Sequence, residues 1–344
     1  MRLFSFMILV GCLSGCGSGA NPGAVPSTPV LVGESASLPS VSPPHENPGT
    51  VTPRWMECAA EWGLNAIYRD GSESNFYAIL ESLGGGVGIL DFDRDGQFDL
   101  YFPAGGAFHP SKQPYGFPSR FFRRVGAGYR DVSAECAGTL MPYYSHGCAV
   151  SDYDNDGFDD VLVTGYGGVQ LFHNQGDGTF QEISDGGHLV DPAWSSSAAW
   201  GDFNGDGAND LYIAHYVNWS PENDPACFHL PPDTREVCPP REFEGLPDRL
   251  FLGDGAGGFT SPAESFGDVS RGKGLGVATG DIDLDGDLDV YVTNDTVMNS
   301  LLMNRDELTL VESGELSGTG YGDTGRPDGS MGVDIGDVNG DGLP

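Results

Sequence analysis

Asp and Asn side chains recur in five short segments of this sequence with one spacing. Each segment has Asp or Asn at its first, third and fifth positions and Gly at its sixth, and the four complete copies carry Asp at the ninth. The side-chain oxygens at positions 1, 3 and 5 converge when the chain turns tightly, and Gly at position 6 permits such a turn. The copies are loop 1 (91–99, DFDRDGQFD), loop 2 (152–160, DYDNDGFDD), loop 3 (202–210, DFNGDGAND), loop 4 (281–289, DIDLDGDLD) and loop 5 (337–344, DVNGDGLP).

A convergent set of carboxylate oxygens is suited to Ca²⁺, which takes six to eight oxygen ligands at about 2.3–2.6 Å. We expect a backbone carbonyl at position 7 and the Asp at position 9 to complete the shell. Hairpin turns alone would account for one such loop, but five copies with the same arrangement favour a cation. The sequence therefore predicts four complete calcium sites and a fifth that lacks its ninth residue. The expected ligands are Asp91, Asp93, Asp95 and Asp99; Asp152, Asp154, Asp156 and Asp160; Asp202, Asn204, Asp206 and Asp210; Asp281, Asp283, Asp285 and Asp289; and Asp337, Asn339 and Asp341.

The loops differ from EF-hand and dockerin loops, which place a bidentate acid at position 12 and are flanked by helices. Here the last acid is at position 9, and apolar segments typical of strands lie on both sides. Carboxylates that hold a cation stay ionised, so they are also poor general acids for glycoside chemistry.

The flanking segments repeat together with the loops. A strand of small residues precedes each loop, a second strand follows it, and a third strand leads through a Gly-rich turn to a fourth. The loop starts are 61, 50, 79 and 56 residues apart, a spacing typical of propeller blades or larger repeats. The sequence predicts an all-β fold, a β-propeller of four-stranded antiparallel blades, with about five blades present.

Two blades are longer than the others between their second and third strands. The extra residues are roughly 104–118 and 218–247, and antiparallel topology places both insertions at the end of the blades away from the acidic loops. The second insertion contains Cys227 and Cys238, which we expect to form a disulfide, with free thiols as the alternative. We expect Cys148 to be a core residue, and Cys58 and Cys136 are candidates for a further bridge.

Composition and motifs exclude several classes of function. Asp and Glu total 50 against 16 Lys and Arg, a formal net charge of −34, which repels nucleic acid and anionic lipid headgroups. No G-x-S-x-G, H-E-x-x-H or P-loop motif is present. Gly253, Gly255 and Gly258 match G-x-G-x-x-G, but more strand follows in place of a helix, so we interpret them as a hairpin turn. We therefore expect that this protein is not an enzyme.

The first residues are typical of an export signal. A basic residue, a short apolar run and small residues follow one another, and the run is too short to span a bilayer. Cys16, or alternatively Cys12, ends a stretch that resembles a lipoprotein cleavage box. We therefore expect a leader over 1–16, a Pro-, Ser- and Gly-rich tether over 17–53 and the propeller over 54–344, exported and either lipid-anchored at the cell envelope or secreted.

The pattern of a strand, DxDxDGxxD, a strand and then N-x-G-D-G-x-F resembles the FG-GAP/VCBS-type repeat of integrin α-subunit propellers and of many bacterial exported proteins. The stretches WMECAAEWGL, GCAVSDYDNDGFDDVLV and CPPREFEGLPDRLF resemble the cartilage-acidic-protein-like family, which often ends in an ASPIC/UnbV domain. The resemblance runs from about residue 54 to the end of the chain. It implies a seven-bladed propeller loaded with Ca²⁺ and used for adhesion or binding. The sequence stops inside loop 5 and its fourth Gly turn is degenerate, so we expect roughly two blades and any C-terminal domain to be absent.

These observations predict a calcium-binding extracytoplasmic module that binds a protein or glycan ligand and touches the membrane through a lipid anchor only. Two alternatives are a propeller that acts on, or guides, polysaccharide for an enzyme, and a surface-layer protein without a specific ligand. The aromatic residues of the insertions are the support for the first of these alternatives.

Overall fold

The computed structural model describes residues 56–137, 141–184, 188–229, 234–262, 271–305 and 308–343. Residues 59–336 form one compact unit, and residues 337–343 lie outside it and are described by themselves. The predicted leader, its two candidate lipidation sites and the tether up to residue 53 are outside the described residues. No helix among the described residues has the length and apolar character needed to cross a membrane.

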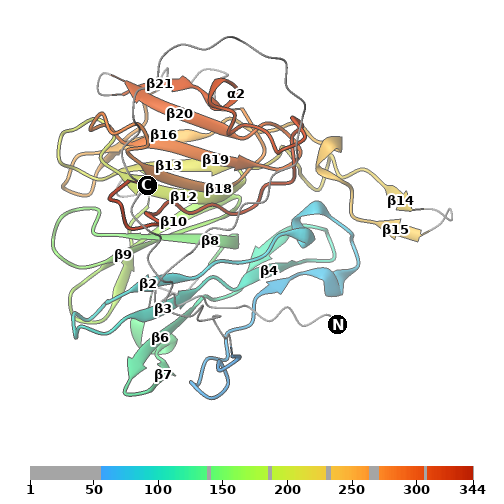
Figure 1. Cartoon of the computed structure of the whole chain (residues 1–344). Helices are drawn as coiled ribbons and strands as arrows, with labels where there is room; N and C mark the ends of the chain where they lie inside the picture. Colours follow the sequence, from blue (N-terminus) through green and yellow to red (C-terminus); the bar gives the residue numbers. More distant parts are fainter. Residues whose placement is uncertain are drawn as a thin grey trace, which may run out of the picture. The chain divides into compact units, whose positions relative to one another are not determined.

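Four sheets of four antiparallel strands confirm the predicted blades (Figure 1). In each of these sheets the strands follow one another in sequence order. The strands of the insertions belong to separate, smaller sheets. Blade 1 has β2 (Gly88–Leu90), β3 (Asp99–Phe102), β6 (Arg120–Val125) and β7 (Gly128–Asp131), and blade 2 has β8 (Tyr144–Ser151), β9 (Asp160–Tyr166), β10 (Gly168–Asn174) and β11 (Phe180–Glu182). Blade 3 has β12 (Ser195–Gly201), β13 (Asp210–His215), β16 (Arg249–Gly253) and β17 (Phe259–Thr260), and blade 4 has β18 (Gly274–Gly280), β19 (Asp289–Asn294), β20 (Ser300–Arg305) and β21 (Thr309–Glu312).

A fifth blade is not formed. Residues 331–336 precede loop 5 as the small-residue strands precede the other loops, but they pair with no strand in the described part of the chain. A strand is held by its hydrogen-bonded neighbours, and residues 331–343 include no partner strand. The expected count of about five blades is therefore four in this structure, and no sheet among the described residues closes.

The hydrophobic core is divided into layers between neighbouring blades. Strand residues alternate between the two faces of a sheet, so Val161 and Val163 of β9 pack with blade 1, whereas Leu162 packs with blade 3. A third layer joins Tyr212 of blade 3 to Val290 of blade 4. Blades 2 and 3 thus each have two apolar faces, and a neighbouring blade covers each of them.

Hydrogen bonds connect successive blades at their first strands, in one case from the neighbouring second strand. The Thr164 hydroxyl donates to the Ser196 carbonyl at 3.2 Å, and the Ser196 hydroxyl donates to the Gly274 carbonyl at 2.7 Å. A Cβ on Gly147 would lie 3.2 Å from the Ser196 carbonyl oxygen. The predicted small residues are therefore needed where these strands approach one another.

Both insertions carry strands of their own. β4 (Gly105–Phe108) pairs with β5 (Pro114–Gly116) and, in parallel, with β1 (Arg69–Asp70). The second insertion forms the ribbon of β14 (Cys227–His229) and β15 (Thr234–Glu236), which projects from the blades in Figure 1. The short helices are η1 (Ser72–Ser74), η2 (Ile79–Ser82), η3 (Pro240–Glu242), α1 (Ser133–Cys136) and α2 (Gly314–Ser317).

The cysteines that the structure describes comprise one disulfide-bonded pair and three free thiols. A disulfide joins Cys227 to Cys238, whose Cα atoms are 5.2 Å apart, at the base of the ribbon. Cys58, Cys136 and Cys148 are free, so the candidate bridge between Cys58 and Cys136 is not formed. Cys148 packs beside the core layer between blades 1 and 2.

The two insertions pack against each other over an aromatic cluster. The rings of Phe108 and Trp219 are 6.3 Å apart, and the Lys112 ammonium lies 3.8 Å from the Asp224 carboxylate. Trp194 lies in the same cluster, with its ring centroid 6.1 Å from that of Trp219. The insertions therefore have a shared apolar base and are not isolated loops.

Candidate metal centres

Each of the four complete loops joins the first strand of its blade to the second and is wound around its own carboxylates. The first Asp accepts the backbone N–H of the Gly at position 6, over 2.8 Å in loops 1 and 2, 2.9 Å in loop 3 and 3.1 Å in loop 4. The fifth residue, also Asp, accepts the N–H at position 7 over 2.8–3.1 Å. Loop 5 makes the same two bonds, from Gly342 to Asp337 at 2.7 Å and from Leu343 to Asp341 at 3.0 Å.

This winding requires a left-handed backbone at two positions. Gly at position 6 has φ between 83° and 103° in the complete loops, as the sequence indicates. Position 4 is also left-handed, with φ of 56° at Arg94, 58° at Asn155 and 62° at Leu284. Sequence reasoning missed position 4, because residues other than Gly occupy it in three of the four complete loops.

Side-chain oxygens of the loops come together, and in two loops the set is that of positions 1, 3 and 5. In loops 2 and 4 one side-chain oxygen from each of these residues lies within 4.8 Å of the others, and loop 1 gathers Asp91, Asp93 and Asp99 in the same way. In loop 3, Asp202 and Asn204 both accept the N–H of Asp206, at 3.1 and 3.0 Å. Side-chain oxygens thus converge in every complete loop.

The Asp at position 9 has a structural task that sequence reasoning missed. Asp210 accepts the N–H of Phe203 with Oδ2 and that of Gly253 with Oδ1, both at 2.9 Å. Asp160 and Asp289 make the same pair of bonds in their blades. The buried ninth carboxylate therefore fastens the acidic loop to the third strand of its blade.

Burial raises the pKa of these carboxyls. The pKa of Asp99 rises to about 6, that of Asp160 to about 8 and that of Asp210 to about 6, in each case mainly because burial penalises the charged form. Neighbouring loop carboxylates raise the pKa further. A cation at the loop would reverse both effects, because it favours the ionised form.

Asparagine side chains connect one blade to the loop of the previous blade. Asn174 donates to the Phe92 carbonyl at 2.8 Å, and Asn304 donates to the Phe203 carbonyl at 2.7 Å. In blade 3, where Gly253 replaces this Asn, the amide of Asn209 donates to the Asp152 carbonyl at 2.8 Å. The Asn of the N-x-G-D-G pattern could have identified the first of these contacts.

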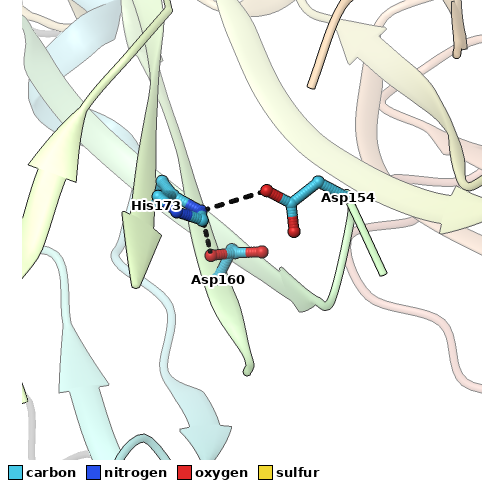
Figure 2. Close-up of side chains that lie close together, drawn as sticks. All are labelled: Asp154, Asp160 and His173. Atoms are coloured by element: carbon cyan, nitrogen blue, oxygen red, sulfur yellow. Dashed lines mark ion pairs between the residues drawn. The ribbon is translucent and has the colours of Figure 1, made fainter. Parts of the chain in front are cut away.

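Basic side chains lie beside three of the complete loops. Arg123 of β6 contacts Asp93 and Asp95, and Arg305 of β20 contacts Asp283 and Asp285. Figure 2 shows the ring of His173 of β10 directed toward both Asp154 and Asp160, with its Nδ1 atom 3.3 Å from a carboxylate oxygen of each. Because these side chains lie outside the repeated motif, the sequence pattern did not reveal them.

Two carboxylate oxygens in these loops are left without a hydrogen bond although they are buried. They are Oδ2 of Asp99 and Oδ1 of Asp152. A buried carboxylate oxygen without a partner is costly, and a cation would satisfy it. The donors that the loops themselves supply at positions 1, 3, 5 and 9 are oxygens, which is the chemistry of Ca²⁺ and not that of a soft metal. The residues present therefore fit a hard divalent cation.

Comparison with known proteins agrees with the repeat. Residues 152–213, which contain loops 2 and 3, match the FG-GAP-like repeat family model. Cartilage acidic protein 1 is 24% identical over 179 residues in Xenopus tropicalis and 27% identical over 179 residues in Mus musculus. Each match covers 46% of this chain and 26% of the relative, so the chain spans about a quarter of the length of these proteins. The chain thus carries FG-GAP-like repeats and resembles cartilage acidic protein 1.

Two solved structures resemble parts of the fold. An Agrocybe aegerita lectin that recognises non-reducing terminal N-acetylglucosamine has a TM-score of 0.36 at 14% identity, over 65% of this chain and 49% of the lectin. The V. cholerae biofilm matrix protein Bap1 has a TM-score of 0.30 at 15% identity, over 66% of this chain and 38% of Bap1.

Proposed function

We propose that this chain is a calcium-binding, extracytoplasmic binding module. The observation that carries the proposal is the buried Oδ2 atom of Asp99, which has no hydrogen-bond partner and belongs to a group with Asp91 and Asp93. Calcium acts as a structural ion here: it satisfies such oxygens, relieves repulsion between carboxylates of one loop and keeps each loop closed. The same chemistry gives these acids no catalytic role, in keeping with a module that is not an enzyme.

The ligand side of the proposal rests on the insertions. They join the second strand to the third, at the opposite end of the blades from the acidic loops, and they stand on the buried aromatic cluster. The Phe228 ring of the β14–β15 ribbon is 60% exposed, with the Arg235 guanidinium 5.9 Å from its centroid. An aromatic ring beside a guanidinium on a disulfide-fastened ribbon suits contact with a protein or glycan surface. Export and the lipid anchor rest on the residues of the predicted leader.

Calcium is expected to raise the melting temperature of the protein. An ion that binds the folded state and not the unfolded chain stabilises it by about 2.7 kcal/mol per site at about 100 times its Kd. For a domain of this size that is a rise of about 5 °C or more over the value in excess chelator. Thermal unfolding followed by circular dichroism, with magnesium as the control ion, measures it. Equal melting temperatures in calcium and in chelator would contradict the proposal.

The calcium effect is also expected to depend on pH. The folded chain without calcium binds protons at Asp160 and Asp210 more tightly than the unfolded chain does, since burial raises their pKa values to about 8 and about 6. Calcium must displace these protons. The rise in melting temperature should therefore shrink as pH falls from about 8 to about 5, and a rise that grows on acidification would contradict carboxylate ligation.

A further inference from the structure

The number of acids in a loop and the presence of a basic side chain beside it change together. Loops 1, 2 and 4 have Asp at positions 1, 3, 5 and 9, and each is contacted by Arg or His from the third strand of its blade. Loop 3 has Asn204 in place of the third-position Asp. Among the described residues, no Lys, Arg or His forms an ion pair with Asp202, Asp206 or Asp210 of that loop.

The basic side chains contact the oxygens that a cation would use. Arg123 reaches Asp93 and lies 3.4 Å from Asp95, which are the third and fifth residues of loop 1. Arg305 reaches the third residue of loop 4 in the same way and lies 2.6 Å from the fifth, Asp285. Arg123 lies on β6 and Arg305 on β20, the third strands of blades 1 and 4. Their positions along these strands are not equivalent.

A guanidinium stays protonated at all relevant pH values, so these contacts are permanent charges beside the loops. A divalent cation and a guanidinium on the same carboxylates repel each other, because both lie within a few ångströms of one centre. Without metal, the guanidinium lowers the repulsion among the carboxylates of its loop. With metal, it opposes binding. One side chain therefore has effects of opposite sign on the apo and the calcium-bound states.

We infer that Arg123 and Arg305 are internal counter-ions that hold loops 1 and 4 closed without metal and compete with calcium for the same carboxylates. The inference rests on the proposed calcium binding and concerns how that binding is regulated. At positions 1, 3, 5 and 9 loop 3 has one carboxylate fewer than the other complete loops, and no basic side chain of the described residues pairs with its acids. The complete loops thus differ in how their negative charge is compensated. In loops 1 and 4 an Arg side chain compensates part of it, whereas in loop 3 the compensation would come from the bound cation.

The test uses Arg123→Gln and Arg305→Gln in the full chain, with Arg130→Gln as the matched control. Arg130 lies in blade 1, as Arg123 does, and pairs with Glu135 at 2.9 Å, away from the acidic loops. In chelator we expect the two test variants to melt about 2–4 °C below the wild type, since each loses a partly exposed guanidinium that is paired with two carboxylates. In isothermal titration with calcium chloride we expect one class of site to bind about five- to tenfold more tightly. Arg123→Lys keeps the charge and should retain the wild-type affinity.

Three possible results distinguish an error in this inference from an error in the proposed function. If the wild type binds calcium and the Gln variants bind it no more tightly, the inference is overturned and the proposed function stands. If the wild type shows no heat of calcium binding and no shift in melting temperature, the proposed function is wrong. If Arg130→Gln tightens calcium binding as much as Arg123→Gln does, general surface charge is responsible and the inference is overturned.

Discussion

Replacing Asp210 by alanine is expected to destabilise the protein by about 3 kcal/mol or more, even in excess chelator. The Asp210 side chain is buried, and its two oxygens accept the N–H groups of Phe203 and Gly253. Alanine leaves both buried amides without an acceptor, and each costs about 1–3 kcal/mol. Loop 3 would also be detached from β16. Urea unfolding followed by tryptophan fluorescence measures the loss.

The matched control for this substitution is Asp206→Ala in the same loop. The Asp206 side chain is exposed, and its Oδ1 atom accepts one N–H within the loop, that of Ala208. In chelator we expect Asp206→Ala to cost less than about 1 kcal/mol, while in calcium it should lose most of the stabilisation by the ion at loop 3. Equal losses for the two variants in chelator would show that position 9 has no special structural role.

The second large effect is expected at Trp194, in the aromatic cluster beneath the insertions. Its indole N–H donates to Nε2 of His146 at 2.9 Å, and its ring makes edge contacts with Tyr166 and Tyr216 at centroid distances of 5.5 and 5.1 Å. Burial lowers the pKa of His146 to about 3, so the imidazole stays neutral and can accept this bond. Trp194→Ala should cost about 3–5 kcal/mol, because it leaves a cavity and an unpartnered ring nitrogen.

Two further variants separate the contributions of packing and hydrogen bonding at this position. Trp194→Phe keeps an aromatic ring and removes the N–H, so we expect a loss of about 1–2 kcal/mol in urea unfolding. Phe98→Ala, at a side chain that is 70% exposed, should change the stability by less than about 0.5 kcal/mol. If Trp194→Ala proves as mild as Phe98→Ala, the insertions do not share a core with blades 2 and 3.

The repeat made much of this fold predictable. The repeat of four strands per blade, the acidic loops between the first and second strands and the place of the two insertions all follow from short-range patterns with period 2 and from topology. A fifth blade did not follow, because a strand depends on partners elsewhere in the chain, and residues 331–336 find none in the described structure. Pattern shows that a segment can pair and not whether it does.

The site was predictable in composition and less so in its division of tasks. Spacing selected the acids at positions 1, 3, 5 and 9, but it did not distinguish Asp210, whose oxygens bind backbone amides, from Asp206 in the same loop. That difference arises because the third strand lies far along the chain and meets the loop only in the folded blade. Arg123 and Arg305 were missed for the same reason: they lie on third strands, outside the repeated motif, and meet the loops only in the folded blade.

The central claim is that divalent cations lie among the carboxylates of the acidic loops. An anomalous difference map from crystals grown in calcium, collected at long wavelength, tests it most directly. The account predicts a peak within about 2.3–2.6 Å of the side-chain oxygens at positions 1, 3 and 5 of each complete loop. A map without peaks at these loops, with Arg123 and Arg305 still seated on the carboxylates at saturating calcium, would contradict it.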